Sequence, residues 1–142
     1  MKIILTKLLG YFQIFISAGA LAGGIQLIVV PDGSSMNLST GILAGTPFTN
    51  FLIPGISLFT VIGLGNLSGA WLCLKNKKIA GIYGLFLGMG LIIWMLVQII
   101  LIGWGSWLQP FYLTLGTFEL VLGLMLFKKV KTKKIHDSHK EE

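Results

Sequence analysis

The chain has 142 residues, of which 54% are hydrophobic and only 11% are Asp, Glu, Lys or Arg, whereas roughly a quarter of the residues of a soluble domain are charged. The mean hydropathy is +0.85 and the net charge is +6. A soluble globule of this size could not cover so much apolar surface. The composition therefore excludes a cytosolic enzyme, a disordered chain and a nucleic-acid-binding domain, and it indicates an integral membrane protein with lipid as its solvent.

Four apolar segments are each long enough to cross a bilayer, which takes about 20 residues. None of these segments carries a lysine. We therefore predict an all-α, four-helix transmembrane bundle over residues 1–127, followed by a polar cytoplasmic tail over residues 128–142. The spans are expected at about residues 8–30, 51–74, 79–104 and 110–127.

The connection after the first span is the longest one. Pro31-Asp32-Gly33 predicts a turn that ends the span, and the mixture of apolar and small polar residues over 35–44 favours a short interfacial helix in this outer loop. Thr46-Pro47 resembles an N-cap followed by proline at the first helical position. The second helix is therefore expected to begin near Pro47, with a kink at Pro54.

The cations are eleven lysines with no arginine, and their placement predicts the topology. Two lysines precede the first span, three lie between the second and third spans, and six follow the fourth. Four spans place all three groups on one side of the membrane, and the positive-inside rule makes that side the cytoplasm. We expect a multi-pass protein of the cell membrane with both termini inside. The lysine-rich tail is expected to bind anionic lipid headgroups.

Nineteen glycines are many for a helical protein, but in lipid small residues let helices approach closely. Gly65 and Gly69 form one GxxxG pair in the second span, and Gly84 and Gly88 form another in the third. The two pairs lie at equal chain distances from the turn between these spans, and therefore at equal depth. We predict that the two glycine faces meet in a tight hairpin. The alternative is that one of them mediates a homodimer.

Glu119 is the single acid within a predicted span. It lies eight residues before Phe127, about 12 Å from the inner end of its helix and close to the midplane. An acid at that depth is costly and is expected to face protein or water. Asn66 reaches a similar depth in the second span, and Gln13 lies in the inner half of the first. These three residues form a candidate intramembrane polar cluster.

The surroundings of Glu119 place it against another helix. Tyr112, Gly116, Glu119 and Gly123 follow a spacing of four, three and four residues, so they share one helical face. Two interpretations of the acid are open. It either links helices through a polar hydrogen bond, or it binds a proton or a cation.

A second polar layer is expected near the outer ends of the spans. Gln26 lies close to the end of the first span, Gln98 lies in the outer half of the third, and Gln109 precedes the fourth. Together with Trp94 and Asp32, these residues are candidates for lining a small outward-facing cavity. The alternative is ordinary hydrogen bonding between helices.

Two stretches carry short motifs of proline, glycine and aromatic residues. One is Pro31-Asp32-Gly33, followed by Gly45-Thr46-Pro47-Phe48 and Phe51-Leu52-Ile53-Pro54-Gly55. The other is Trp94 with Gln98, then Leu108-Gln109-Pro110, and Tyr112 with Gly116. Over about residues 8–125, the chain resembles a set of small, uncharacterised bacterial four-span membrane proteins. The resemblance implies the four-span topology and a bacterial plasma membrane, and it assigns no catalytic or binding residue.

The function expected from these patterns is that of a non-enzymatic accessory or interaction protein. The chain has no Ser-His-Asp set, paired carboxylate, phosphate-binding loop or metal-ligand spacing. With one cysteine, Cys73, and both histidines in the tail, we expect no cofactor and no metal. The alternative is a small oligomeric transporter or channel, coupled to protons or cations through Glu119, and a lipid-modifying enzyme is the third reading. The expected partners are the lipid bilayer and a second copy or another membrane protein, with no nucleic acid.

Overall fold

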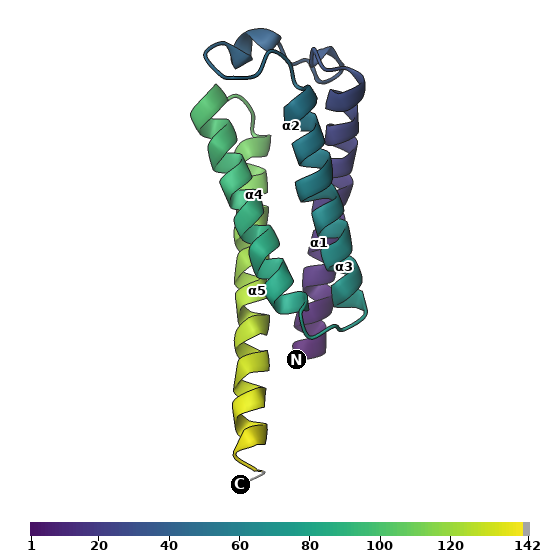
Figure 1. The fold of residues 1–142 in the computed structure, drawn as a ribbon, viewed down its shortest axis with the longest axis vertical. Helices are drawn as coiled ribbons and strands as arrows, with labels where there is room; N and C mark the ends of the chain where they lie inside the picture. The colour runs from purple at the N-terminus through teal and green to yellow at the C-terminus, as the bar shows by residue number, and fades with distance from the viewer. Residues whose placement is uncertain (141–142) are drawn as a thin grey trace.

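The computed structural model describes residues 1–140, and every regular element within them is helical (Figure 1). Four helical segments are long and apolar enough to cross a membrane, which confirms the predicted all-α architecture. The first, third and fourth are α1 (Lys2–Val29), α4 (Ala80–Ile102) and α5 (Leu108–Ser138). The second is an irregular helix composed of α2 (Leu52–Ser57), η3 (Leu58–Leu64) and α3 (Gly65–Leu74).

Two of the helices extend beyond the apolar segments from which they were predicted. α1 begins at Lys2, before its apolar run, and α5 continues past Phe127 to Ser138, an extension of about 16 Å at 1.5 Å per residue. Both chain ends and the turn between α3 and α4 lie at the same end of the bundle (Figure 1). The three lysine groups of the sequence therefore gather at that end.

The long connection between α1 and α2 caps the opposite end of the bundle. In place of the expected single helix over 35–44, it forms two short 3-10 turns, η1 (Ser34–Met36) and η2 (Thr40–Leu43). Leu27, Leu43 and Phe51 are buried together beneath these turns. The loop therefore has a small apolar core of its own, which a straight interfacial helix would not enclose.

The second helix begins at Leu52, so the expected start near Pro47 is wrong. The Thr46 hydroxyl holds a local turn, because it donates to the carbonyl of Leu43 at 2.8 Å and accepts from the backbone nitrogen of Phe48 at 3.2 Å. The side chain of Asn50 accepts from the backbone nitrogen of Leu52 at 3.0 Å, at the true start. Pro54 then falls in the first turn, where proline removes no helical hydrogen bond.

The middle of the second helix, η3, is a π-helix of seven residues. Widened turns of this kind leave backbone carbonyls that need partners, above all in lipid. Two buried side chains supply hydrogen bonds at its C-terminal end. The Ser17 hydroxyl of α1 donates to the carbonyl of Gly63, and the Asn66 amide donates to the carbonyl of Ile62, both at 2.9 Å.

The bundle consists of two closely packed helix pairs, α1 with the irregular second helix and α4 with α5 (Figure 1). Glycines allow both close approaches. In the first pair, a Cβ atom placed on Gly24 would lie 2.8 Å from the backbone nitrogen of Phe59. In the second pair, a Cβ atom on Gly88 would lie 2.5 Å from the backbone nitrogen of Leu120.

The predicted contact between the glycine faces of the second and third spans is wrong. Gly65 and Gly69 lie against the side chain of Leu87, whereas Gly84 faces α1 and Gly88 faces α5. Equal distance from a turn sets the depth of two residues, but it does not set the rotation of either helix about its axis. All four glycines make contacts within the chain.

We predict that Gly88→Ala lowers the free energy of unfolding by about 1–3 kcal/mol, because the added methyl group overpacks the α4–α5 contact. Gly90→Ala is the matched control, since a Cβ atom there meets no atom of residues 1–140 within 4 Å. Unfolding in mixed micelles, followed by circular dichroism, measures both effects. Equal stability of the two variants would contradict the close packing of α4 on α5.

Candidate functional site

A buried hydrogen bond between Gln13 and Glu119 joins the two helix pairs. Gln13 comes from α1 and Glu119 comes from α5, and the Nε2 atom of Gln13 donates to the Oε1 atom of Glu119 at 2.9 Å. Both side chains are 0% exposed. Since these residues are 106 positions apart in the sequence, the bond fixes how one pair sits against the other.

Apolar layers enclose this bond on both sides along the bundle. On the side away from the lysines, buried residues form one cluster: Ile16, Ala20, Ile62, Leu91, Met95 and Leu115. On the lysine side they form a second: Leu9, Cys73, Ala80, Leu122 and Leu126. A hydrogen bond shielded from water in this way is electrostatically stronger, and leaving either partner alone is correspondingly costly.

Two glycines make room for the amide of Gln13. A Cβ atom on Gly69 of α3 would lie 2.8 Å from its Nε2 atom, and one on Gly84 of α4 would lie 3.4 Å from the same atom. The side chain of Gln13 therefore crosses the centre of the bundle between helices that carry no side chain at these points. This role for the two glycines was not foreseen from the GxxxG spacing.

Cys73 is a third member of the buried polar group, and the sequence analysis missed it. Its thiol donates to the Oε1 atom of Gln13 at 3.4 Å, so a chain of hydrogen bonds runs from α3 through α1 to α5. The signal was available, because Cys73 lies seven residues after Asn66 and so shares its helical face. We define Gln13, Cys73 and Glu119 as the polar trio.

Asn66 lies buried as expected, but it makes no hydrogen bond to the polar trio. Its amide nitrogen donates to its own helix at Ile62. Its Oδ1 atom and the Oε2 atom of Glu119 are both buried without a hydrogen-bond partner among the described residues. The candidate cluster is thus joined at Gln13 and Glu119, with Asn66 supporting the π-helix.

The side chain of Gln109 holds the connection between α4 and α5 through three hydrogen bonds. Its Nε2 atom donates to the carbonyl of Gly103 at 3.0 Å, and its Oε1 atom accepts from the backbone nitrogen atoms of Gly105 at 3.0 Å and Ser106 at 3.4 Å. These bonds tie the turn between α4 and α5. Gln109 is therefore buried in its own connection, away from the expected outer cavity.

The other residues of the expected outer layer are dispersed. Asp32 is exposed, and its carboxylate accepts from the backbone nitrogen of Ser34 at 2.9 Å, which lowers the pKa of Asp32 below its ordinary value. Gln26 is exposed, Gln98 is half-buried, and the indole nitrogen of Trp94 is buried without a partner in the described chain. Within residues 1–140, no hydrogen bond connects any two members of this set.

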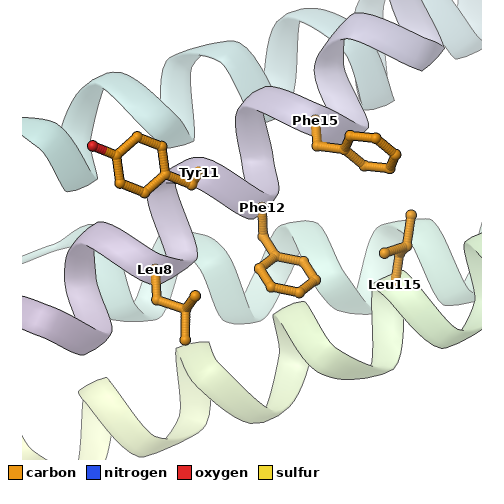
Figure 2. A pocket seen from close by; sticks show the side chains of 5 residues that line it. All are labelled: Leu8, Tyr11, Phe12, Phe15 and Leu115. Atoms are coloured by element: carbon orange, nitrogen blue, oxygen red, sulfur yellow. The ribbon is translucent and has the colours of Figure 1, made fainter.

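An apolar groove opens at the surface between α1 and α5, with a volume of about 390 Å³. Its lining consists of Leu8, Tyr11, Phe12, Phe15 and Leu115. Figure 2 shows Leu8 and Phe12 extending from α1 toward α5, and Leu115 extending back toward α1. The tyrosine hydroxyl in the same view points toward the N-terminal end of α1. We call this feature the α1/α5 groove.

Within residues 1–140, no three His, Cys, Asp or Glu side chains form a group suited to a metal ion. A comparison with protein-family models finds no match, and comparisons with curated proteins and with solved structures find no significant similarity.

We predict that Glu119→Leu lowers the free energy of unfolding by about 1–3 kcal/mol, because the Gln13 amide loses its buried acceptor. Glu119→Gln keeps an acceptor oxygen and is expected to retain most of that stability. The double variant Gln13→Leu with Glu119→Leu should cost less than the sum of the single variants, with a coupling of about 0.5–2 kcal/mol. Strict additivity in micelle unfolding would show that the two side chains do not interact.

Proposed function

We propose that the chain is a non-enzymatic integral membrane protein that acts by binding other components of the cell membrane. The observation that carries this proposal is the contrast between its interior and its surface. The polar trio is bonded inward, where it supports the helices, whereas the α1/α5 groove presents apolar side chains outward. A concave site lined by apolar side chains is suited to lipid tails or to the apolar face of another helix.

We further propose that the lysine end faces the cytoplasm of a bacterial cell. The support is the positive-inside rule, applied to a bundle in which both termini and the α3–α4 turn lie at one end (Figure 1). The outer loop over residues 31–51 then faces the exterior, and its segment carries no lysine.

A labelling experiment tests this orientation. Ser35→Cys lies in the outer loop and Ser138→Cys lies at the end of α5, and both positions are exposed. A membrane-impermeant maleimide should label the first variant in intact cells and the second only after the membrane is opened. The native Cys73 is buried and serves as the unlabelled background. Labelling of Ser138→Cys in intact cells would reverse the proposed orientation.

A second candidate function is a small oligomeric transporter or channel coupled to protons or cations through Glu119. One observation favours it: the Oε2 atom of Glu119 and the Oδ1 atom of Asn66 are buried acceptors that have no hydrogen-bond partner within residues 1–140. A buried acceptor atom without a hydrogen-bond partner is stabilised when it binds a proton, a water molecule or an ion. Both lie within the bundle, where a transported cation would have to pass.

Reconstituted vesicles separate the two candidates. If the chain acts by binding, vesicles with the wild type or with Glu119→Gln should show the same slow proton and cation leak as empty vesicles, and their lipids should stay unmodified. Glu119→Gln is suited to this test because it keeps the hydrogen bond to Gln13 while removing the titratable group. A flux that disappears in Glu119→Gln would establish the second candidate, and lipid turnover would show that the chain is an enzyme.

A further inference from the structure

We infer that the α1/α5 groove binds an anionic phospholipid, with an acyl chain in the groove and the phosphate at the lysine end. This inference rests on the proposed binding function and names the partner. The volume of about 390 Å³ lies within the range of roughly 300–1,000 Å³ that is usual for small-molecule sites. Its lining is apolar, as an acyl chain requires.

Two aromatic pairs join α1 and α5 at the groove. The rings of Phe12 and Phe118 lie 6.1 Å apart, and the rings of Phe15 and Phe111 lie 6.2 Å apart. These pairs bring α1 and α5 together at separate depths. The side chains of α1 and α5 leave the groove between the two helices unfilled, and an acyl chain from the bilayer fits into it.

The α1 wall changes from cationic to apolar along one face. Lys7, Tyr11 and Phe15 are four residues apart, so they form a stripe on the helix. Lys7 is exposed at the end of the stripe near the N-terminus, and Tyr11 is 61% exposed with its hydroxyl pointing toward that end (Figure 2). The stripe therefore runs from a cation through a phenol to a hydrocarbon wall. This order complements a phospholipid, which runs from an anionic phosphate to an apolar tail.

On α5, a lysine likewise lies beyond apolar residues, of which Leu115 lines the groove and Leu122 is buried in the core. Leu115, Leu122 and Lys129 are seven residues apart, so they share a face of the helix. Lys129 is half-buried, unlike Lys128 beside it, which is exposed. Because α5 runs antiparallel to α1 (Figure 1), Lys129, which follows Leu115 in α5, and Lys7, which precedes Leu8 in α1, both fall toward the end of the bundle that carries the chain termini. Two cations from two helices therefore flank the place where the phosphate would sit.

Charge also favours a lipid over a second copy of the chain in this groove. A second copy inserted with the same orientation would bring its own lysines to the same end, where like charges repel. An anionic lipid carries a negative charge that is attracted to these lysines, whereas a zwitterionic lipid has no net charge. The groove should therefore select by headgroup charge among lipids with identical acyl chains.

Native mass spectrometry of the full-length chain in detergent tests this selection. The chain is offered equal amounts of phosphatidylglycerol and phosphatidylcholine with matched acyl chains. We expect retained phosphatidylglycerol on the wild type, and binding weakened about fivefold by Lys7→Gln, as expected for one lysine lost near an anionic headgroup. Leu8→Trp should weaken the binding of both lipids by filling the groove.

Two control variants make the outcome decisive. Lys77→Gln removes a lysine at the same end but outside the groove, and Ile93→Trp adds a large side chain on α4 at a position that is 55% exposed. Both controls should bind phosphatidylglycerol like the wild type. Leu8 is itself 42% exposed, so its replacement leaves the core intact, and circular dichroism checks that all four variants keep their helix content.

Three results would overturn the inference. They are equal retention of the two lipids, an equal loss in Lys77→Gln and Lys7→Gln, and a dimer that Leu8→Trp disrupts. The last result would assign the groove to a second copy and would leave the proposed binding function standing. Flux or lipid turnover in the vesicle experiment would instead overturn the proposed function, whatever lipid the groove holds.

Discussion

The bond between Gln13 and Glu119 is the interaction on which the arrangement of this bundle depends. In a bilayer the lipid tails are as apolar as the helices, so burial of apolar side chains does not drive one helix pair onto the other. A polar hydrogen bond in the centre does, because an unpaired amide or acid in hydrocarbon is costly. The bond joins α1 to α5 and thereby fixes one helix pair against the other. Cys73 extends it to α3, because its thiol donates to the oxygen of the Gln13 amide.

Close packing of backbones is the second requirement, and it is what makes the bond possible. Gly69 and Gly84 leave the space that the Gln13 amide occupies, while Gly88 lets α5 lie directly on α4. Small residues therefore serve two purposes here, approach of helices and room for a polar side chain. The π-helix in the second span belongs to the same pattern, since Ser17 and Asn66 supply hydrogen bonds to its carbonyls.

With its polar groups directed inward, the chain presents to the membrane a hydrocarbon surface, a groove and a cationic end. This division links the fold to the proposed function. The groove lies between α1 and α5, which aromatic pairs join at two depths. Lysines lie toward one end of the groove because α1 begins and α5 ends in lysine-containing segments. A phospholipid with a negative headgroup matches both properties at once.

The sequence by itself determined the helical class, the four apolar segments and the gathering of lysines at one end, because these follow from composition and from the order of apolar and charged residues. It also indicated that Glu119 lies on a packed face beside Gly116 and Gly123. Only the tertiary structure decided which helices pair, since the depth of a residue follows from chain length but the rotation of a helix does not. Rotation turned Gly88 toward α5. The level at which Gln13 packs against the second helix brought it to Cys73 rather than to Asn66 on the same helical face, and local hydrogen bonds hold Gln109 in the connection between α4 and α5.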